Sequence, residues 1–433
     1  MKRRSLRSAI SLLLIVLVSM QLVGCAGMEE PSTVQPEPTQ TGVQAPTLKT
    51  VNLMAEIAPQ AASSATVTAE AAAAASDFAL RLFRAGATST ENTLLSPISV
   101  LCALAMTANG AQGETRTQME DVLGKDCALW NSFFRAYQDA LSDDEVLQLA
   151  NSIWFTASER FTVNRDFLQT NADFYGSDVY QAPFDETTLA DINGWVKEKT
   201  KGMIPEILDE IPESAVMYLI NALAFDANWE TPYSAYSIAS GDFYCQDGTS
   251  CQAVYMSSTE EQYLETDKLT GFLKPYKGGK YAFVALLPKE GLTTADVLES
   301  LDGASLQAML SAPQQISVDI ALPKFEGTYS AELSEVLTAM GMELPFDHAR
   351  ADFSGLGVSE AGNIFISRVL HKTFISVNEN GTQAAAATVV EACDEACVVD
   401  YKSVFLDRPF VYLLIDCETN LPLFLGTMLN PTA

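Results

Sequence analysis

Residues 377–390 read VNENGTQAAAATVV, a run of small residues that follows an alternating, strand-like stretch. Propensity alone favours a short helix, because the alanines follow Thr382 and threonine caps helix N-termini well. A second interpretation takes Asn380-Gly381 as the turn of a β-hairpin. The next segment, EACDEAC at 391–397, is acidic and rich in small residues, so it is unlike a core strand and disturbs both interpretations.

Short motifs on both sides of this stretch follow one another in a fixed order. They are NTLLSPIS at 92–99, INGWV at 192–196, TKG at 200–202, LINA at 219–222, Trp229, LPKF at 322–325, His371-Lys372, FLDRPFVY at 405–412 and the tail from Gly426 to Pro431. Together with the acidic residue, Gly-Thr and alanine run after position 378, they resemble the serpin family. The resemblance extends from about Phe78 to Pro431 without a large gap.

The resemblance implies a serpin fold, which is an α+β domain with a large central antiparallel-rich sheet, flanking helices and an exposed reactive-centre loop. The hydrophobic pattern agrees with this class. Helical spacing dominates the early part of the chain, whereas alternating stretches at 281–287, 316–322, 364–377 and 410–415 dominate the late part.

The function implied by the resemblance is suicide inhibition of a serine protease, or of a cysteine protease. The target attacks the loop and forms an acyl-enzyme, and the cut loop then inserts into the sheet as an extra strand that drags and distorts the protease. The chain supplies bait and stored strain, with no catalytic group and no cofactor, so we expect no enzymatic activity. The alternative is a non-inhibitory serpin that acts as a surface binding or scaffold protein.

As an inserted strand, the alanine-rich run would turn every second side chain to the buried face of the sheet. Each of those side chains, from Thr382 to Val390, is small or β-branched. Gly381 supplies backbone freedom for a pivot. The hinge residues are therefore Glu379, Gly381, Thr382, Ala384, Ala386 and Thr388.

Family resemblance also implies a region where the sheet opens. Its members are Ser96, Pro97, Ser99, Asn221 and His371, with Trp229 near the point where the loop would insert. Each of these residues could instead be a satisfied core residue. For His371 with Asn221 we expect a buried hydrogen bond that holds the sheet closed.

The bond that a protease would cut is ambiguous. Counting forward from Gly381 in the family register places it at Glu395-Ala396, whereas counting backward from 408–410 places it near Val398-Val399. The candidates for the reactive bond are Glu395, Ala396, Cys397 and Val398, and we favour the forward count because insertion depth is set from the hinge. No basic residue lies between Gly381 and Val399, so we expect an elastase-like or acidic-residue-cleaving target, not a trypsin-like one.

Two pairs of cysteines are close in the sequence. Cys245 and Cys251 flank Asp247-Gly248, a hairpin-turn signal, and could be bridged across that hairpin. Cys393 and Cys397 lie in the loop, where four extended residues span about 13 Å, too far for a disulfide. A bridge there would bend the loop and suppress inhibition; free thiols are the other interpretation.

Composition excludes several classes of function. The 433 residues include 26 Lys plus Arg against 55 Asp plus Glu, for a net charge of −29, so nucleic acid is a poor partner. Only two histidines are present, which argues against imidazole-rich zinc sites and His-based catalysis, and we expect no metal. We expect a monomer.

The N-terminus has the features of an export signal. Basic residues precede an apolar run at 12–18, which is followed by LVGC at 22–25. This ending resembles a bacterial lipobox, in which Cys25 is acylated; an ordinary signal with an incidental cysteine is the alternative. We predict a lipoprotein signal peptide at 1–24, a disordered membrane-tether linker at 25–70 and a serpin domain at 71–433. The protein would then be extracytoplasmic and lipid-anchored to the bacterial cell membrane or surface.

Overall fold

The computed structural model describes residues 49–60, 66–142, 144–157, 161–212, 214–360, 362–382 and 402–432. From Leu48 onward the chain forms one unit. Within the described ranges, no helix is long and apolar enough to span a bilayer. The predicted signal peptide and Cys25 lie outside these ranges, as do 383–401 with the predicted reactive bond.

Helices fill most of the first third of the domain. α1 begins after Thr68, whose side chain accepts a hydrogen bond from the Ala71 N–H, and alanines then favour continuation of the helix. The helices are α1 (Ala69–Gly86), α2 (Pro97–Ala108), α3 (Gly113–Leu123), α4 (Cys127–Leu141), α5 (Arg165–Phe174), α6 (Glu186–Lys199), α7 (Thr294–Glu299), α8 (Gly303–Ser311) and α9 (Ser334–Ala339).

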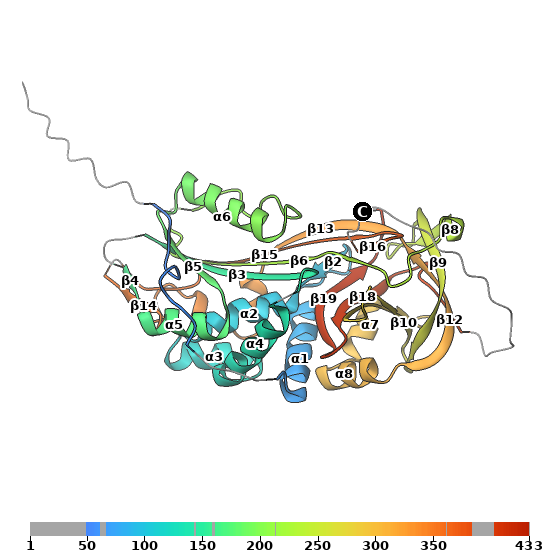
Figure 1. The fold of residues 1–433 in the computed structure, drawn as a ribbon, viewed down its shortest axis with the longest axis horizontal. Helices are drawn as coiled ribbons and strands as arrows, with labels where there is room; N and C mark the ends of the chain where they lie inside the picture. Colours follow the sequence, from blue (N-terminus) through green and yellow to red (C-terminus); the bar gives the residue numbers. More distant parts are fainter. Residues whose placement is uncertain are drawn as a thin grey trace, which may run out of the picture. The chain divides into compact units, whose positions relative to one another are not determined.

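A central sheet, sheet A, separates two layers of helix. It has the order β1-β5-β3-β6-β15-β16-β7, with β13 paired to β15. Its strands are β1 (Val51–Asn52), β3 (Leu147–Thr156), β5 (Asp178–Ala182), β6 (Met217–Phe225), β7 (Ala227–Asn228), β13 (Phe325–Glu332), β15 (Arg368–Val377) and β16 (Gly381–Thr382). α6 covers one face, and α2 lies against the other (Figure 1).

β6 shows how the two faces of sheet A are filled. All nine residues of β6 are buried, as expected for a strand covered on both faces. Tyr218 and Ile220 pack with residues of α6, whereas Leu219 and Leu223 belong to the larger core that contains α2. Asn221 therefore points toward α2, and it is a polar residue inside an otherwise apolar strand.

A second large sheet, sheet B, lies beside sheet A. Its order is β17-β12-β9-β10-β11-β18-β19-β2, with β8 paired to β9, and β4 pairs with β14 in a separate ribbon. The strands are β2 (Thr93–Leu95), β4 (Phe161–Val163), β8 (Ile238–Tyr244), β9 (Ser250–Glu265), β10 (Leu269–Pro275), β11 (Tyr281–Pro288), β12 (Gln314–Pro323), β14 (Gly357–Ser359), β17 (Lys402–Phe405), β18 (Phe410–Asp416) and β19 (Leu421–Met428).

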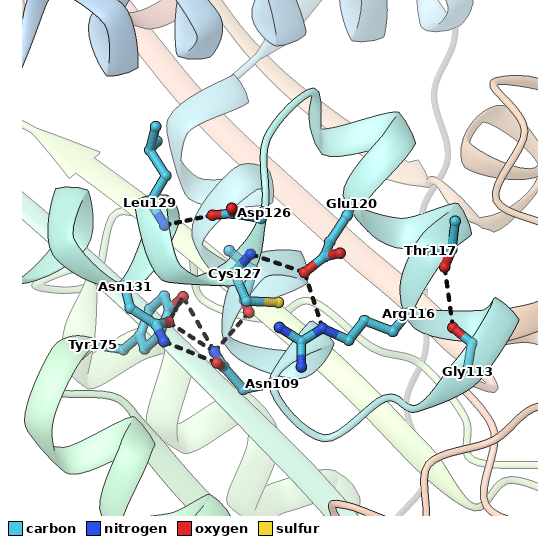
Figure 2. A network of polar contacts seen from close by, with 11 residues as sticks. Asn109, Gly113, Arg116, Thr117, Glu120, Asp126, Cys127, Leu129, Asn131 and Tyr175 are labelled. Atoms are coloured by element: carbon cyan, nitrogen blue, oxygen red, sulfur yellow. Dashed lines mark hydrogen bonds and ion pairs between the residues drawn. The ribbon is translucent and has the colours of Figure 1, made fainter.

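Polar side chains fix the helices behind sheet A (Figure 2). Glu120 of α3 accepts hydrogen bonds from the Arg116 guanidinium (2.9 Å) and from the first N–H of α4 (3.0 Å). The amides of Asn109 and Asn131 bond each other reciprocally at 2.9 and 3.0 Å, and the Tyr175 hydroxyl donates to Asn131 at 2.7 Å. These contacts tie α2, α3, α4 and the end of α5 together, so α2 has a fixed position behind sheet A.

The predicted α+β class is confirmed, because helices and two large sheets, one of them central and flanked by helices, build the described residues. The strand expected at 364–377 begins only at Arg368. Ile366 lies outside the sheet, since its N–H donates to the carbonyl of Pro345.

The structure differs from the predicted linker at residues 49–60. Val51 and Asn52 form β1 and pair with β5, and the Leu53 N–H donates to the Val179 carbonyl at 2.8 Å. Leu53, Met54 and Ile57 pack against the core. The prolines and alanines around these three side chains give the stretch the average composition of a linker, but its strand pairing and packing show that the folded unit begins well before residue 71.

Candidate functional site

In sheet A, β6 and β15 pair directly over one part of their length, whereas another strand lies beside β15 over the rest. β6 and β15 pair directly, in parallel, from Tyr218↔Arg368 to Ala222↔Lys372, and we call these paired residues the seam. Beyond the seam, β16 lies between β15 and β7, with Val377 opposite Thr382. Gly381 and Thr382, which begin the small-residue run, therefore already form a strand. The direction of β16 leads toward the seam.

The chain reverses in a tight turn before β16. The Asn378 N–H donates to the Gly381 carbonyl at 3.0 Å, and the Asn378 side chain accepts from the Asn380 N–H at 2.9 Å. A hairpin turn was one of the two local interpretations of this stretch. The structure has such a turn, although Glu379-Asn380 rather than Asn380-Gly381 forms its centre. Thr382 is paired as a strand residue, and the alanines that the helix interpretation concerns lie outside the described residues.

Gly381 is required here by close packing. A Cβ at this position would lie 2.0 Å from the Ala227 carbonyl oxygen and 2.7 Å from the Asn228 Cα, both main-chain atoms that cannot yield easily. The sequence-based reason, freedom to pivot, concerns a motion; in this structure the absent side chain lets β16 approach β7.

Thr382 is buried, with 2% of its surface exposed, on the core side of sheet A. Its hydroxyl lies 2.5 Å from the Tyr276 hydroxyl. Tyr276 comes from the turn after β10, and its ring stacks on Trp229 at a centroid distance of 4.4 Å. Tyr276 was not found from the sequence, since it is more than 100 residues from the hinge.

Trp229 holds the turn before β16 with two hydrogen bonds. Its N–H donates to the Asn380 carbonyl at 2.8 Å, and its indole Nε1–H donates to the Asn378 carbonyl at 2.9 Å. The Tyr233 N–H donates to the Glu379 carbonyl at 2.9 Å. The structure thus places Trp229 directly beside the predicted hinge.

Two ion pairs flank this aromatic layer. Lys324 bonds the Glu379 carboxylate, which lowers the pKa of Glu379. Lys274 and Glu260 form a buried pair at 2.6 Å, with side chains 2% and 10% exposed. The Lys274 ammonium also lies over the Tyr233 ring, 4.4 Å from its centroid. Burial lowers the pKa of Lys274, and Glu260 opposes that shift.

Three of the residues implied by resemblance meet across the seam, and we call Ser96, Asn221 and His371 the latch. Asn221 and His371 are opposite each other in the β6–β15 register, and Oδ1 of Asn221 bonds Nδ1 of His371. The Ser96 N–H donates to Nε2 at 3.0 Å. Because Nε2 accepts, the proton of the neutral ring is on Nδ1 and is donated to Asn221.

The latch is dry. His371 is 1% exposed, and burial lowers its pKa to about 3. Ser99 donates to Oδ1 of Asn221 at 3.4 Å, while Pro97 is the first residue of α2. Among the described residues, Nδ2 of Asn221 and Oγ of Ser96 find no hydrogen-bond partner. The expected His371–Asn221 contact exists, and its role in opening stays a prediction.

The remaining predicted site residues lie outside the described ranges. They are Ala384, Ala386 and Thr388 of the hinge, the bond candidates Glu395, Ala396, Cys397 and Val398, and the acylation candidate Cys25. Tyr276, Tyr233, Lys274 and Glu260 were missed. The signal for Lys274 was present, because a lysine interrupts the apolar strand at 269–275.

Comparisons with known proteins agree with this geometry. Residues 73–431 match the family model described as Serpin (serine protease inhibitor). An uncharacterized serpin-like protein of Thermococcus kodakarensis is 32% identical over 370 residues, covering 83% of this chain and 85% of that protein. The plasma serine protease inhibitor of Bos taurus is 29% identical over 370 residues, covering 82% and 90%. The native-state crystal structure of the thermophilic serpin tengpin has a TM-score of 0.85 at 41% identity and covers 88% of this chain and 100% of its own.

Proposed function

The chain belongs to the serpin family, and we propose that it traps a target serine protease by inserting its cut reactive loop between β6 and β15. The observation that carries the proposal is the position of β16. The hinge strand is already paired between β15 and β7 at the mouth of the seam, so insertion continues an existing strand.

The register of β16 fixes where each later residue would go. With Thr382 opposite Val377, continuation of the strand in this register would bring Ala384 opposite Ile375 and Thr388 opposite His371. Val377, Ile375 and His371 are all buried, so the small side chains of the hinge would enter a space with no room for bulky ones. Thr388 would bring a hydroxyl to the latch, where Nδ2 of Asn221 has no partner among the described residues.

Insertion has a favourable free energy because each inserted residue adds ladder hydrogen bonds. About 15 residues at a net ~1 kcal/mol per bond give roughly 10 kcal/mol or more. The backbone hydrogen bonds lost between β6 and β15 are replaced, because each of these two strands then pairs with the inserted strand. The uncut protein is therefore held kinetically, by the latch and by the intact loop.

The chemistry is supplied by the protease. Its nucleophile attacks the loop carbonyl, the peptide bond breaks, and the new amine leaves with the segment that leads to β17, while the acyl group stays on the protease. Insertion must then outpace attack by water on that ester. As a serpin, the chain is an inhibitor and not an enzyme.

The test is capture of a protease in a complex of summed mass that survives SDS. Thr382→Arg would place a charged side chain where Thr382 is now 2% exposed and should convert the protein from inhibitor to substrate. Thr117→Arg, on the exposed side of α3, is the matched control and should still trap. Trapping by Thr382→Arg would contradict insertion. Loop cleavage without complex or gain in heat stability, for every protease tried, would instead favour a binding or scaffold role.

The target class follows from the loop. Since 382–399 contains no basic residue, we propose an elastase-like or acidic-residue-cleaving target. Installing arginine tests the position of the bond: Glu395→Arg should create a trypsin trap if Glu395 precedes the cut bond, and Val398→Arg should do so if Val398 does. Sequencing the released C-terminal peptide gives an independent answer.

We also propose that Cys25 is acylated and tethers the protein outside the bacterial cytoplasm. The LVGC motif after an apolar run supports this. In the bacterial host the protein should partition into detergent, and Cys25→Ser should move it to the aqueous phase. Equal partitioning of both forms would refute the anchor without affecting the inhibitory proposal.

A further inference from the structure

We propose that Cys245 and Cys251 form a disulfide that clips the β8–β9 hairpin. Cys245 directly follows β8, and Cys251 is the second residue of β9. Their sulfur atoms lie 3.6 Å apart. A disulfide bond is about 2.0 Å long, so the two sulfurs need only a short further approach to form one.

The backbone around the two cysteines is fixed by the hairpin itself. The Cys245 N–H donates to the Thr249 carbonyl at 2.8 Å, and Cys251 is in register with Phe243. Gly248 in the turn has φ of +82°, a value that glycine adopts without strain. The two sulfurs are therefore held near each other by main-chain pairing, so bond formation orders little that is not already ordered.

Contacts from elsewhere in the domain hold this end of the hairpin in place. The Gln246 N–H donates to the Leu429 carbonyl at 3.2 Å, and the Tyr244 N–H donates to the Asp407 carbonyl at 2.8 Å. The Cys251 sulfur also lies 3.5 Å from Oδ1 of Asn430. The two backbone hydrogen bonds do not depend on the state of the thiols, so the hairpin keeps its place against the C-terminal tail and the residues that follow β17 whether or not the disulfide forms.

A reagent can reach the pair. Cys245 is only 7% exposed, but it lines a cavity of about 530 Å³ together with Asp247 and Asn430. Cys251 is more exposed. Among the other described cysteines, Cys102 and Cys127 are both buried, and no sulfur–sulfur contact is seen for either of them.

The oxidant we name is a small-molecule disulfide such as oxidised glutathione. The Cys251 thiolate attacks one sulfur of the reagent, which forms a mixed disulfide and releases one glutathione thiolate. The Cys245 sulfur then attacks the Cys251 sulfur and expels the second glutathione. The two protein thiols are oxidised, the reagent is reduced to two thiols, and the two protein protons pass to the released glutathione.

The chain allows a direct assay. Between Lys201 and Lys268 there is no lysine or arginine, so trypsin releases both cysteines, and no others, on the single peptide 202–268. The folded full-length protein is equilibrated with oxidised glutathione, alkylated with iodoacetamide without reduction, and digested. We expect a peptide that carries no alkyl group and is lighter by two hydrogen atoms than the reduced peptide.

Variants and melting behaviour make the test decisive. Cys251→Ser should abolish the lighter peptide, while Cys417→Ser, at a half-buried thiol elsewhere, should leave it unchanged. The clipped protein should melt about 3 °C above the reduced one, as expected for a short closed loop in a chain of this size. Alkylation at both positions, or a glutathione adduct that persists at Cys251, would overturn the proposal whatever the protein inhibits.

Discussion

Acid should weaken the seam through His371. Its pKa falls from 6.5 to about 3 because burial disfavours the imidazolium. Between pH 6.5 and about 3, His371 therefore binds a proton in the unfolded chain but not in the folded one. Its contribution to the free energy of unfolding is complete well above pH 6.5 and declines as the pH falls toward 3.

The size of the effect follows from the shift. One pH unit is worth about 1.36 kcal/mol, so lowering the pH from 7.5 to 5.0, about 1.5 units below the pKa in the unfolded chain, should cost the folded state about 2 kcal/mol, roughly a thirtyfold change in the folding equilibrium. A protonated Nε2 can no longer accept the hydrogen bond from the Ser96 N–H, whose length is 3.0 Å. The imidazolium would also be buried, because His371 is only 1% exposed.

The assay compares variants across pH. The free energy of the first urea transition is measured at pH 7.5 and 5.0 for wild type, His371→Gln and His348→Gln. Because the chain has two histidines, His348→Gln is the natural control and should keep the acid loss that His371 causes. His371→Gln should be less stable at both values but lose about 2 kcal/mol less on acidification.

One outcome would refute this reasoning: equal acid losses in wild type and His371→Gln. If the variant does not fold, NMR of wild type still decides the matter, since one of only two histidine ring signals should fail to titrate above about pH 5.

Three further predictions concern the hinge region. Gly381→Ala should destabilise the protein by about 1–3 kcal/mol and slow protease trapping, because the new Cβ meets main chain of β7 at 2.0 Å; Gly327→Ala, with no atom within 4 Å, should melt as wild type does. Trp229→Phe keeps the stacking but loses the indole hydrogen bond of 2.9 Å, so chemical denaturation should show a loss of about 1–2 kcal/mol. Lys274→Met should cost roughly 3–5 kcal/mol by leaving Glu260 buried and unpaired, and adding Glu260→Leu should restore most of that stability; equal destabilisation by the single and double changes would count against the pair.

An unsatisfied polar group at the seam would add to the free energy gained by the proposed insertion. Asn221 lies within the fully buried strand β6, and its Nδ2 atom is unsatisfied in the described structure. Such a group costs about 1–3 kcal/mol. An arrangement that supplies a partner, as inserted Thr388 would, gains that amount in addition to the new ladder hydrogen bonds.

Local patterns in the sequence were sufficient for the fold class. The alternating stretches at 281–287 and 410–415 correspond to β11 and β18 within one residue. The order of the motifs predicted a hinge at Gly381-Thr382, where the structure has β16. Strand alternation assigned Thr382 to the buried face of an inserted strand, and in the short strand β16 its side chain is buried. These features are encoded within a few residues of one another.

Contacts between distant parts of the chain needed the tertiary structure. The Thr382–Tyr276 bond, the Lys274–Glu260 pair and the packing of residues 51–57 on the domain join segments whose spacing in sequence carries no periodic signal. The role of Gly381 belongs here too, because a missing Cβ matters only when another main chain lies 2.0 Å from where it would be. Sequence alone therefore determined which elements form and which faces they bury, whereas the approach of one element to another, which depends on every side chain between them, decided how the hinge is held.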